Sequence, residues 1–234
     1  MALAQINALI KLLEGHAYPK ILKDVDYDKT GIEIEMLDKH CLLIRNGLDM
    51  NEQITLFQDI QSKDKSPKDA PKAMYPSPKT LVFDQNKVSI KYKSHQKSVY
   101  NEMVNKANDI INRNNMNINF DVELNKYQSI TMSTIKYPSP NGHFAAHIDH
   151  DNSIVYLLSI GCTTNFMVKG PTMKDKKVFK FKSGDLLVFD ASTKAAILHS
   201  VVNIDNSSSC PVELGNKFNV LQTNRFGVQC RVHF

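Results

Sequence analysis

The sequence predicts an α+β protein that is mainly β, with helices in the first half and a strand-rich second half. Two observations predict this class. Residues 94–113 place apolar side chains at helical spacing, whereas from residue 127 onward short β-like runs alternate with turn signals. At 234 residues and 42% hydrophobic content, the chain is large enough to bury a sizeable core. Many short strands of this kind predict a sandwich or a barrel.

The expected helices come first. Residues 1–15 carry apolar residues at helical spacing and predict a short amphipathic helix. A second helix is expected at residues 51–60, after a polar turn, and short strands at 31–35 and 41–44. The strongest helix is 94–113, whose expected buried stripe consists of Val99, Met103, Val104, Ala107 and either Ile110 or Ile111.

The middle of the chain is more polar. Residues 61–78 are rich in Lys, Asp, Ser and Pro and predict a loop. Residues 79–93 alternate apolar and polar side chains and predict a hairpin or paired strands.

The second half is expected to supply most of the sheet structure. Residues 204–216 contain a run of serines and predict a loop insertion. We expect an N-terminal extension over 1–114 and a β-rich core over 115–234, together forming one compact domain. The expected strands are 129–137, 154–160, 164–168, 177–181, 185–190, 197–203 and part of 217–232.

Composition narrows the class of protein. No apolar run approaches the length of a membrane span, and the N-terminus lacks a secretory signal pattern. Four widely spaced cysteines without a CxxC pair fit reduced thiols better than disulfides or a zinc site. We therefore expect an intracellular protein, cytoplasmic or nuclear, that does not bind a membrane. The sequence leaves the oligomeric state open, with a monomer as the default expectation.

A metal site is predicted by His147, Asp149 and His199. Residues two apart on a strand point to the same side, so His147 and Asp149 can reach one ion together. His199 follows a distant apolar run and can supply the third ligand. Two imidazoles and one carboxylate hold Fe(II) on one face and leave open positions for a cosubstrate and dioxygen. A lone histidine is usually structural, and the prediction depends on the combination.

Two arginines strengthen this interpretation. Arg225 and Arg231 are six residues apart on an expected final strand, so both can face one cavity. Guanidinium groups bind carboxylates in a planar, two-pronged manner, which suits 2-oxoglutarate, a dicarboxylate that chelates the metal through one end.

This pattern resembles that of the AlkB family of Fe(II)/2-oxoglutarate dioxygenases, over roughly the second half of the chain. The resemblance implies a double-stranded β-helix (jelly roll) core with supporting N-terminal helices. It also implies that Arg225 and Tyr137 hold the distal carboxylate and that Arg231 contacts the carboxylate near the metal. Ile135 and Gly227 stand where the family has Asn, so we expect a rearranged cosubstrate pocket.

The resemblance also implies a substrate, namely N-alkylated bases in DNA or RNA. The enzyme would demethylate them oxidatively with Fe(II), 2-oxoglutarate and O2, and release formaldehyde, succinate and CO2. In bacterial relatives an acidic residue at the position of Asp151 often reads the exocyclic amine of the damaged base. The chain has no Trp, so the candidate base-stacking residues are Tyr75 and Tyr92.

Basic residues give separate support for a polyanionic substrate. The net charge is +5, and lysines cluster before and around Tyr92. We expect Lys87, Lys91 and Lys93 to contact phosphates. Two alternatives remain open: a 2-oxoglutarate hydroxylase or demethylase acting on a protein or small molecule, and a non-catalytic jelly-roll binding module.

Overall fold

The computed structural model describes residues 31–63, 84–88, 99–114, 116 and 129–233. The predicted helix at 1–15 lies outside these residues, as do most of the predicted loop at 61–78 and most of the paired strands predicted at 79–93.

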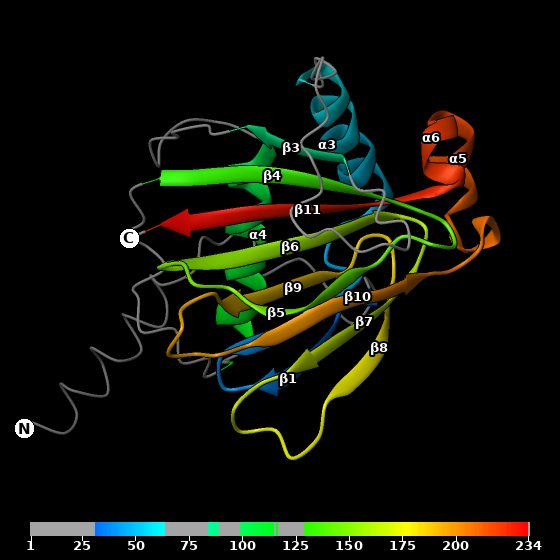
Figure 1. Cartoon of the computed structure of the whole chain (residues 1–234). Helices are drawn as coiled ribbons and strands as arrows, with labels where there is room; N and C mark the ends of the chain where they lie inside the picture. Colours follow the sequence, from blue (N-terminus) through cyan, green and yellow to red (C-terminus); the bar gives the residue numbers. More distant parts are fainter. Residues whose placement is uncertain (1–30, 64–83, 89–98, 115, 117–128, 234) are drawn as a thin grey trace, which may run out of the picture. The chain divides into compact units, whose positions relative to one another are not determined.

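Two antiparallel sheets form the core (Figure 1). The major sheet has seven strands in the order β1 (Glu33–Asp38), β2 (Cys41–Arg45), β9 (Leu186–Asp190), β6 (Ser153–Gly161), β11 (Asn224–His233), β4 (Ser129–Pro138) and β3 (Asp84–Val88). The minor sheet has four, in the order β5 (Phe144–Ile148), β10 (Leu198–Ile204), β7 (Thr164–Lys169) and β8 (Lys177–Phe181). The predicted mainly β jelly roll is confirmed.

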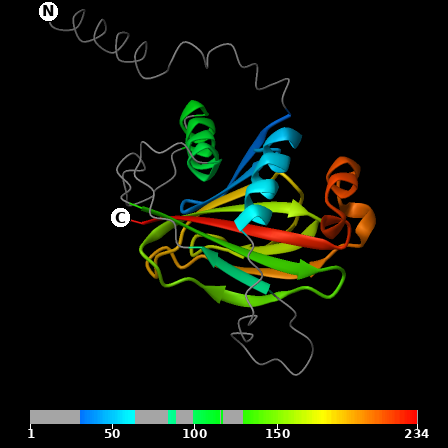
Figure 2. The same cartoon turned by 90° about the horizontal axis from the view of Figure 1, so that it is seen from above.

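Two helices, α3 (Met50–Lys63) and α4 (Val99–Arg113), cover the face of the major sheet that points away from the minor sheet (Figure 2). The ring of Phe57 on α3 lies 5.0 Å from that of Phe226 on β11, edge to face. On α4, Asn108 accepts a hydrogen bond of 2.6 Å from the buried hydroxyl of Tyr156 on β6. These contacts explain why all nine residues of β6 are buried, since the strand is covered on both faces.

Local sequence signals account for both helices. The start of α3 is a capping box, in which Asp49 Oδ1 accepts from the Glu52 amide at 2.9 Å and Glu52 Oε2 accepts from the Asp49 amide at 2.7 Å. On α4, the predicted stripe is largely confirmed because Met103, Val104, Ala107, Ile110 and Ile111 are all buried.

The structure corrects two sequence expectations. Residues 204–216 are not simply a loop, because they contain the 3₁₀ turn η3 (Ser207–Ser209) and most of α5 (Val212–Lys217), which α6 (Asn219–Gln222) follows. These helices are very short, and burial of Leu214 and Leu221 stabilises them more than local propensity does. Strand β5 was not predicted as a separate element, although the metal motif required an extended segment there.

The first half of the chain contributes to the same sheet as the second half. Strand β2 pairs with β9, and β3 pairs with β4. The division at residue 114 stays a prediction. All four cysteines are free and buried, as expected for reduced thiols. Among the residues described, no helix has the length and hydrophobicity needed to span a membrane.

Candidate active site

Pairing between β5 and β10 brings the predicted metal ligands together. His147 lies directly opposite His199 in the register, and their ring centroids are 4.3 Å apart. Asp149 follows the end of β5, with its Oδ1 3.6 Å from Nε2 of His147. One ligand atom from each residue lies within 4.8 Å of the others. Three residues separated by up to 52 positions therefore converge on a volume that fits one metal ion.

Hydrogen bonds orient both imidazoles for metal binding. Nδ1 of His147 lies 3.0 Å from the carbonyl oxygen of Ala145, and Nδ1 of His199 lies 3.1 Å from that of Ile197. A carbonyl can only accept, so Nδ1 carries the proton in each ring and Nε2 keeps its lone pair. Backbone partners of this kind are the usual support for histidine ligands.

The electrostatic environment favours the protonation states that a divalent cation requires. Burial, reinforced by the neighbouring His147, lowers the pKa of His199 to about 4, so this imidazole is neutral at pH 7. Burial acts to raise the pKa of Asp149, but Arg231 and the two histidines outweigh it and the pKa is lowered. The site therefore offers a neutral imidazole at His199 and a carboxylate at Asp149 near neutral pH. Together with the imidazole of His147 they make the donor set expected for Fe(II).

Arg225 is a buried cation. Its side chain is only 1% exposed, its Nε donates to Ser159 Oγ at 3.1 Å, and its guanidinium carbon lies 5.2 Å from the centre of the Tyr137 ring. Burial lowers the pKa of Arg225 to about 10, with Tyr137 opposing the shift, so the group is still charged at pH 7. Nη2 is buried and has no hydrogen-bond partner among the described residues. A buried charged donor without an acceptor fits a site for an anion.

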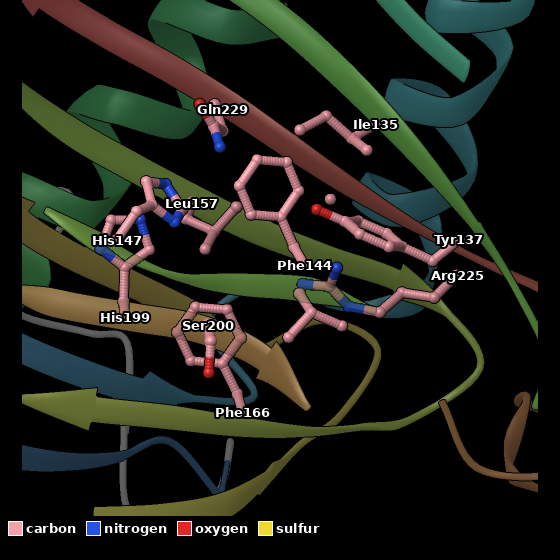
Figure 3. A pocket seen from close by; sticks show the side chains of 12 residues that line it. Ile135, Tyr137, Phe144, His147, Leu157, Phe166, His199, Ser200, Arg225 and Gln229 are labelled. Carbon is pink, nitrogen blue, oxygen red and sulfur yellow. The ribbon is translucent and has the colours of Figure 1, made fainter. Parts of the chain in front are cut away.

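A pocket joins this arginine to the metal-binding residues (Figure 3). It encloses about 370 Å³ of empty space, part of it open to solvent. The polar groups at its two ends are His147 with His199 and Arg225 with Tyr137. Between them the lining is largely apolar and includes Ile135, Phe144, Leu157 and Phe166. A dicarboxylate that chelates the metal could thus reach Arg225 with its other end.

Gly227 and Ile135 lie opposite each other in the pairing of β11 with β4, and both line the pocket. A Cβ atom built on Gly227 would lie 2.9 Å from Nη1 of Arg225 and 3.5 Å from the Tyr137 ring. The Arg225 guanidinium therefore occupies the space that any side chain at position 227 would need. The glycine, one of the two departures from the AlkB pattern, therefore leaves room for the arginine. The other departure, Ile135, adds an apolar side chain to the pocket wall.

Arg231 lies farther along β11, on the metal side. Its Nη2 donates to Asp149 Oδ2 at 2.7 Å and to Gln229 Oε1 at 3.2 Å. Its Nη1 lies 3.5 Å from Asp151 Oδ2. Arg231 thus contacts a predicted metal ligand directly. Its predicted contact with the cosubstrate carboxylate stays a prediction.

The predicted substrate residues have different outcomes. The Asp151 side chain is 39% exposed and lies close to Arg231 and to His233, whose Nδ1 is 3.8 Å from Asp151 Oδ1. Lys87 is in β3, where its backbone pairs with Ser133. Tyr75, Tyr92, Lys91 and Lys93 lie outside the described residues.

Two polar residues of the site were not predicted from the sequence. Ser159 is fully buried on β6 and accepts from Arg225, and Gln229 accepts from Arg231. Each had a usable signal. Ser159 interrupts the largely apolar run of β6 that follows Ser153, and Gln229 shares the face of β11 with both arginines.

Solved structures with a similar fold include an AlkB homologue, OsALKBH1, which superposes with a TM-score of 0.65 at 17% identity over 86% of this chain and all of that one. A Pseudomonas putida prolyl-4-hydroxylase matches with a TM-score of 0.50 at 10% identity, over 89% of this chain and 96% of that one. A prolyl hydroxylase from Trichoplax adhaerens, solved with a peptide fragment of hypoxia inducible factor, matches with a TM-score of 0.50 at 12% identity, over 83% of this chain and 84% of that one. The fold is AlkB-like.

At the level of sequence, no curated protein matches significantly. A family model described as the 2OG-Fe(II) oxygenase superfamily matches residues 40–231, which include both histidines, the aspartate and both arginines of the site. Enzymes of this family use Fe(II), 2-oxoglutarate and O2, in agreement with the donor set and the buried arginine. The chain therefore belongs to the 2OG-Fe(II) oxygenase superfamily.

Proposed function

We propose that this enzyme oxidatively demethylates N-alkylated bases in DNA or RNA. The observation that carries the proposal is the position of Asp151. Its partly exposed carboxylate lies beside Arg231, which itself binds the metal ligand Asp149. A carboxylate at this place can accept a hydrogen bond from the exocyclic amine of cytosine or adenine. An amine held there would bring the neighbouring N-alkyl group close to the metal.

Two further observations support the same substrate class. The AlkB homologue superposes with a higher TM-score than either prolyl hydroxylase, 0.65 against 0.50. The chain also carries a net charge of +5, which favours association with a polyanion.

Bound Fe(II) would supply the oxidation, in which 2-oxoglutarate and O2 are converted to succinate and CO2 and the second oxygen atom of O2 hydroxylates the N-methyl group of the base. The hydroxymethyl group is then released as formaldehyde, which leaves N–H on the base. The protein positions the reactants. His147, Asp149 and His199 would hold the metal, and Arg225 with Tyr137 would hold the far carboxylate of the cosubstrate. The apolar walls of the pocket, among them Phe144 and Phe166, would exclude water from the space between.

A base stacked in a duplex cannot reach this pocket, so the substrate base must be flipped out or lie in a single strand. Stacking on an aromatic side chain would offset part of that cost, and Tyr75 and Tyr92 remain the predicted stacking residues.

The second candidate is a hydroxylase that acts on a protein, favoured by the fold shared with two prolyl hydroxylases. It would use the same metal site and arginine but would not require a phosphate-binding surface. A non-catalytic binding module would form no succinate.

The test supplies the Fe(II)-loaded enzyme and 2-oxoglutarate with oligonucleotides that contain 1-methyladenine or 3-methylcytosine, in single- and double-stranded DNA and RNA. Base mass and succinate are followed together. We expect loss of the methyl group with the wild type and none with Asp149→Ala. Succinate without any change in base mass would contradict the proposal and favour the hydroxylase. Absence of both products from a metal-loaded sample would favour the binding module.

A further inference from the structure

The connection between β7 and β8, at one end of the minor sheet (Figure 1), carries a group of exposed lysines. We call residues 169–176 the lysine loop. It contains Lys169, Lys174 and Lys176, and all three side chains are exposed. Lys169 pairs with Leu198, which pairs on its other side with Ile148, the residue between His147 and Asp149. The loop thus begins on the strand next to β10, which carries His199, and two strands from β5, which carries His147.

A buried carboxylate holds this loop in place. Asp38 is 4% exposed, and its Oδ2 accepts hydrogen bonds from the amide of Thr172, at 3.1 Å, and from the Thr172 hydroxyl. Gly170 allows the close approach, because a Cβ atom there would lie 2.4 Å from the Asp38 carboxylate. The amide of Met173 closes a turn onto the carbonyl of Gly170 at 3.2 Å. A loop anchored in this way presents its lysines with little ordering cost on binding.

The turn between β1 and β2 adds a further exposed lysine, Lys39, directly after Asp38. Within the described part of the chain, no ion pair within 4.0 Å involves Lys39 or any of the three lysines of the loop. The nearby Lys177 differs, because it pairs with Glu35. Asp175 is the single acidic residue of the loop. The surface beside the metal ligands therefore carries an excess of positive charge.

We propose that the lysine loop and Lys39 bind phosphates of a single-stranded nucleic acid next to the base that enters the pocket. This proposal rests on the proposed function. The small dicarboxylate cosubstrate does not explain these charges, because Arg225 would hold it inside the pocket. Several lysines spread over one surface instead match a ligand that repeats its negative charge along a chain.

The test compares two double variants that remove the same charge. Lys174→Gln/Lys176→Gln changes the lysine loop, and Lys182→Gln/Lys217→Gln changes two exposed lysines outside it, before β9 and at the end of α5. Binding of a fluorescent, unmethylated single-stranded oligonucleotide is measured by anisotropy at several salt concentrations with the metal-loaded protein. Melting temperatures establish that both variants are folded.

We expect the loop variant to bind about tenfold more weakly and the slope of log K against log salt to fall by about 1.4, since each lost phosphate contact on a single strand contributes about 0.7. The control variant should bind like the wild type. Equal effects of the two variants, or no effect of either, would overturn the proposal. Tighter binding of a fluorescent acidic peptide than of the oligonucleotide in the same assay would also overturn it, and would assign the surface to a protein partner.

This measurement requires no turnover, so it is independent of the demethylation assay. If binding of the oligonucleotide depends on the lysine loop but the methylated oligonucleotides are not demethylated, the phosphate surface is supported and the proposed function is contradicted. Demethylation by both variants at the wild-type rate and affinity would support the function and overturn the surface.

Discussion

Arg231 donates a hydrogen bond of 2.7 Å to Oδ2 of Asp149, so a positively charged side chain holds one oxygen of this carboxylate while the other, Oδ1, lies 3.6 Å from Nε2 of His147. The contact fixes the orientation of Asp149 and keeps it ionised. Arg231 is therefore a positioning residue for the metal, in addition to any contact with the cosubstrate.

Arg231→Gln should weaken Fe(II) binding by about 10- to 100-fold, the effect typical of removing a group that orients a ligand. Anaerobic titration with Fe(II), or with Co(II) as a spectroscopic substitute, measures the affinity. Arg45→Gln is the matched control, because Arg45 forms an ion pair of the same length with Asp185 away from the metal. An unchanged affinity in Arg231→Gln would exclude the positioning role.

Arg225→Met should abolish 2-oxoglutarate binding without destabilising the ligand-free protein. The buried guanidinium donates to Ser159 and lies against Tyr137, but its Nη2 has no hydrogen-bond partner among the described residues, so its desolvation is incompletely compensated. An apolar side chain of similar length should give a melting temperature at least as high as that of the wild type. In the wild type, cosubstrate at 100 times its Kd should stabilise the fold by about 2.7 kcal/mol.

Thermal melts of the metal-loaded wild type and Arg225→Met, with and without 2-oxoglutarate, measure both effects. A cosubstrate-dependent shift that persists in the variant would show that the dicarboxylate binds elsewhere.

Gly227→Ala should raise the KM for 2-oxoglutarate. The added methyl group would lie 2.9 Å from Nη1 of Arg225 and displace the guanidinium from its position. We expect an increase of about tenfold, equivalent to about 1.4 kcal/mol, with little change in metal affinity. Steady-state succinate formation measures it. Gly215→Ala serves as a control, because its new Cβ contacts only Gln222 and Cys210, outside the pocket. Equal KM values for the two variants would refute the steric argument.

The metal-free protein should lose stability as the pH falls from 6.5 to 4. Because the pKa of His199 is about 4 in the fold and about 6.5 in a free side chain, the unfolded state takes up the proton first. The free energy of unfolding should then fall by up to about 1.4 kcal/mol per pH unit in this window. The lowered pKa of Asp149 acts in the same direction at more acidic pH.

Urea denaturation of chelator-treated protein across this range measures the slope, and His199→Gln should reduce it. A slope that is the same in wild type and variant would show that His199 titrates normally.

The predictable part of the site came from strand periodicity and chemistry. His147, Asp149 and His199 could be selected from the sequence because a two-residue spacing on a strand defines a shared side and Fe(II) requires that donor set. Helices α3 and α4 were also predictable, because the capping box at Asp49 and the stripe on α4 are local signals.

Other features depend on contacts between distant segments and could not be predicted. The support that Ser159 gives to Arg225 follows from the pairing of β6 with β11, which local sequence does not specify. The anchoring of the lysine loop by Asp38 joins residues 134 positions apart. Helices α5 and α6 are too short to show a clear helical period, and they form because Leu214 and Leu221 are buried against the rest of the fold.

The stoichiometry of cosubstrate and substrate tests nucleobase demethylation most directly. Succinate and demethylated base are counted in the same reaction on a single-stranded oligonucleotide with one 1-methyladenine, beside the unmethylated oligonucleotide. We expect one succinate per demethylated base, and faster succinate formation with the methylated strand than with the unmethylated one. Succinate formation at the same rate with both strands and no demethylated base would contradict it.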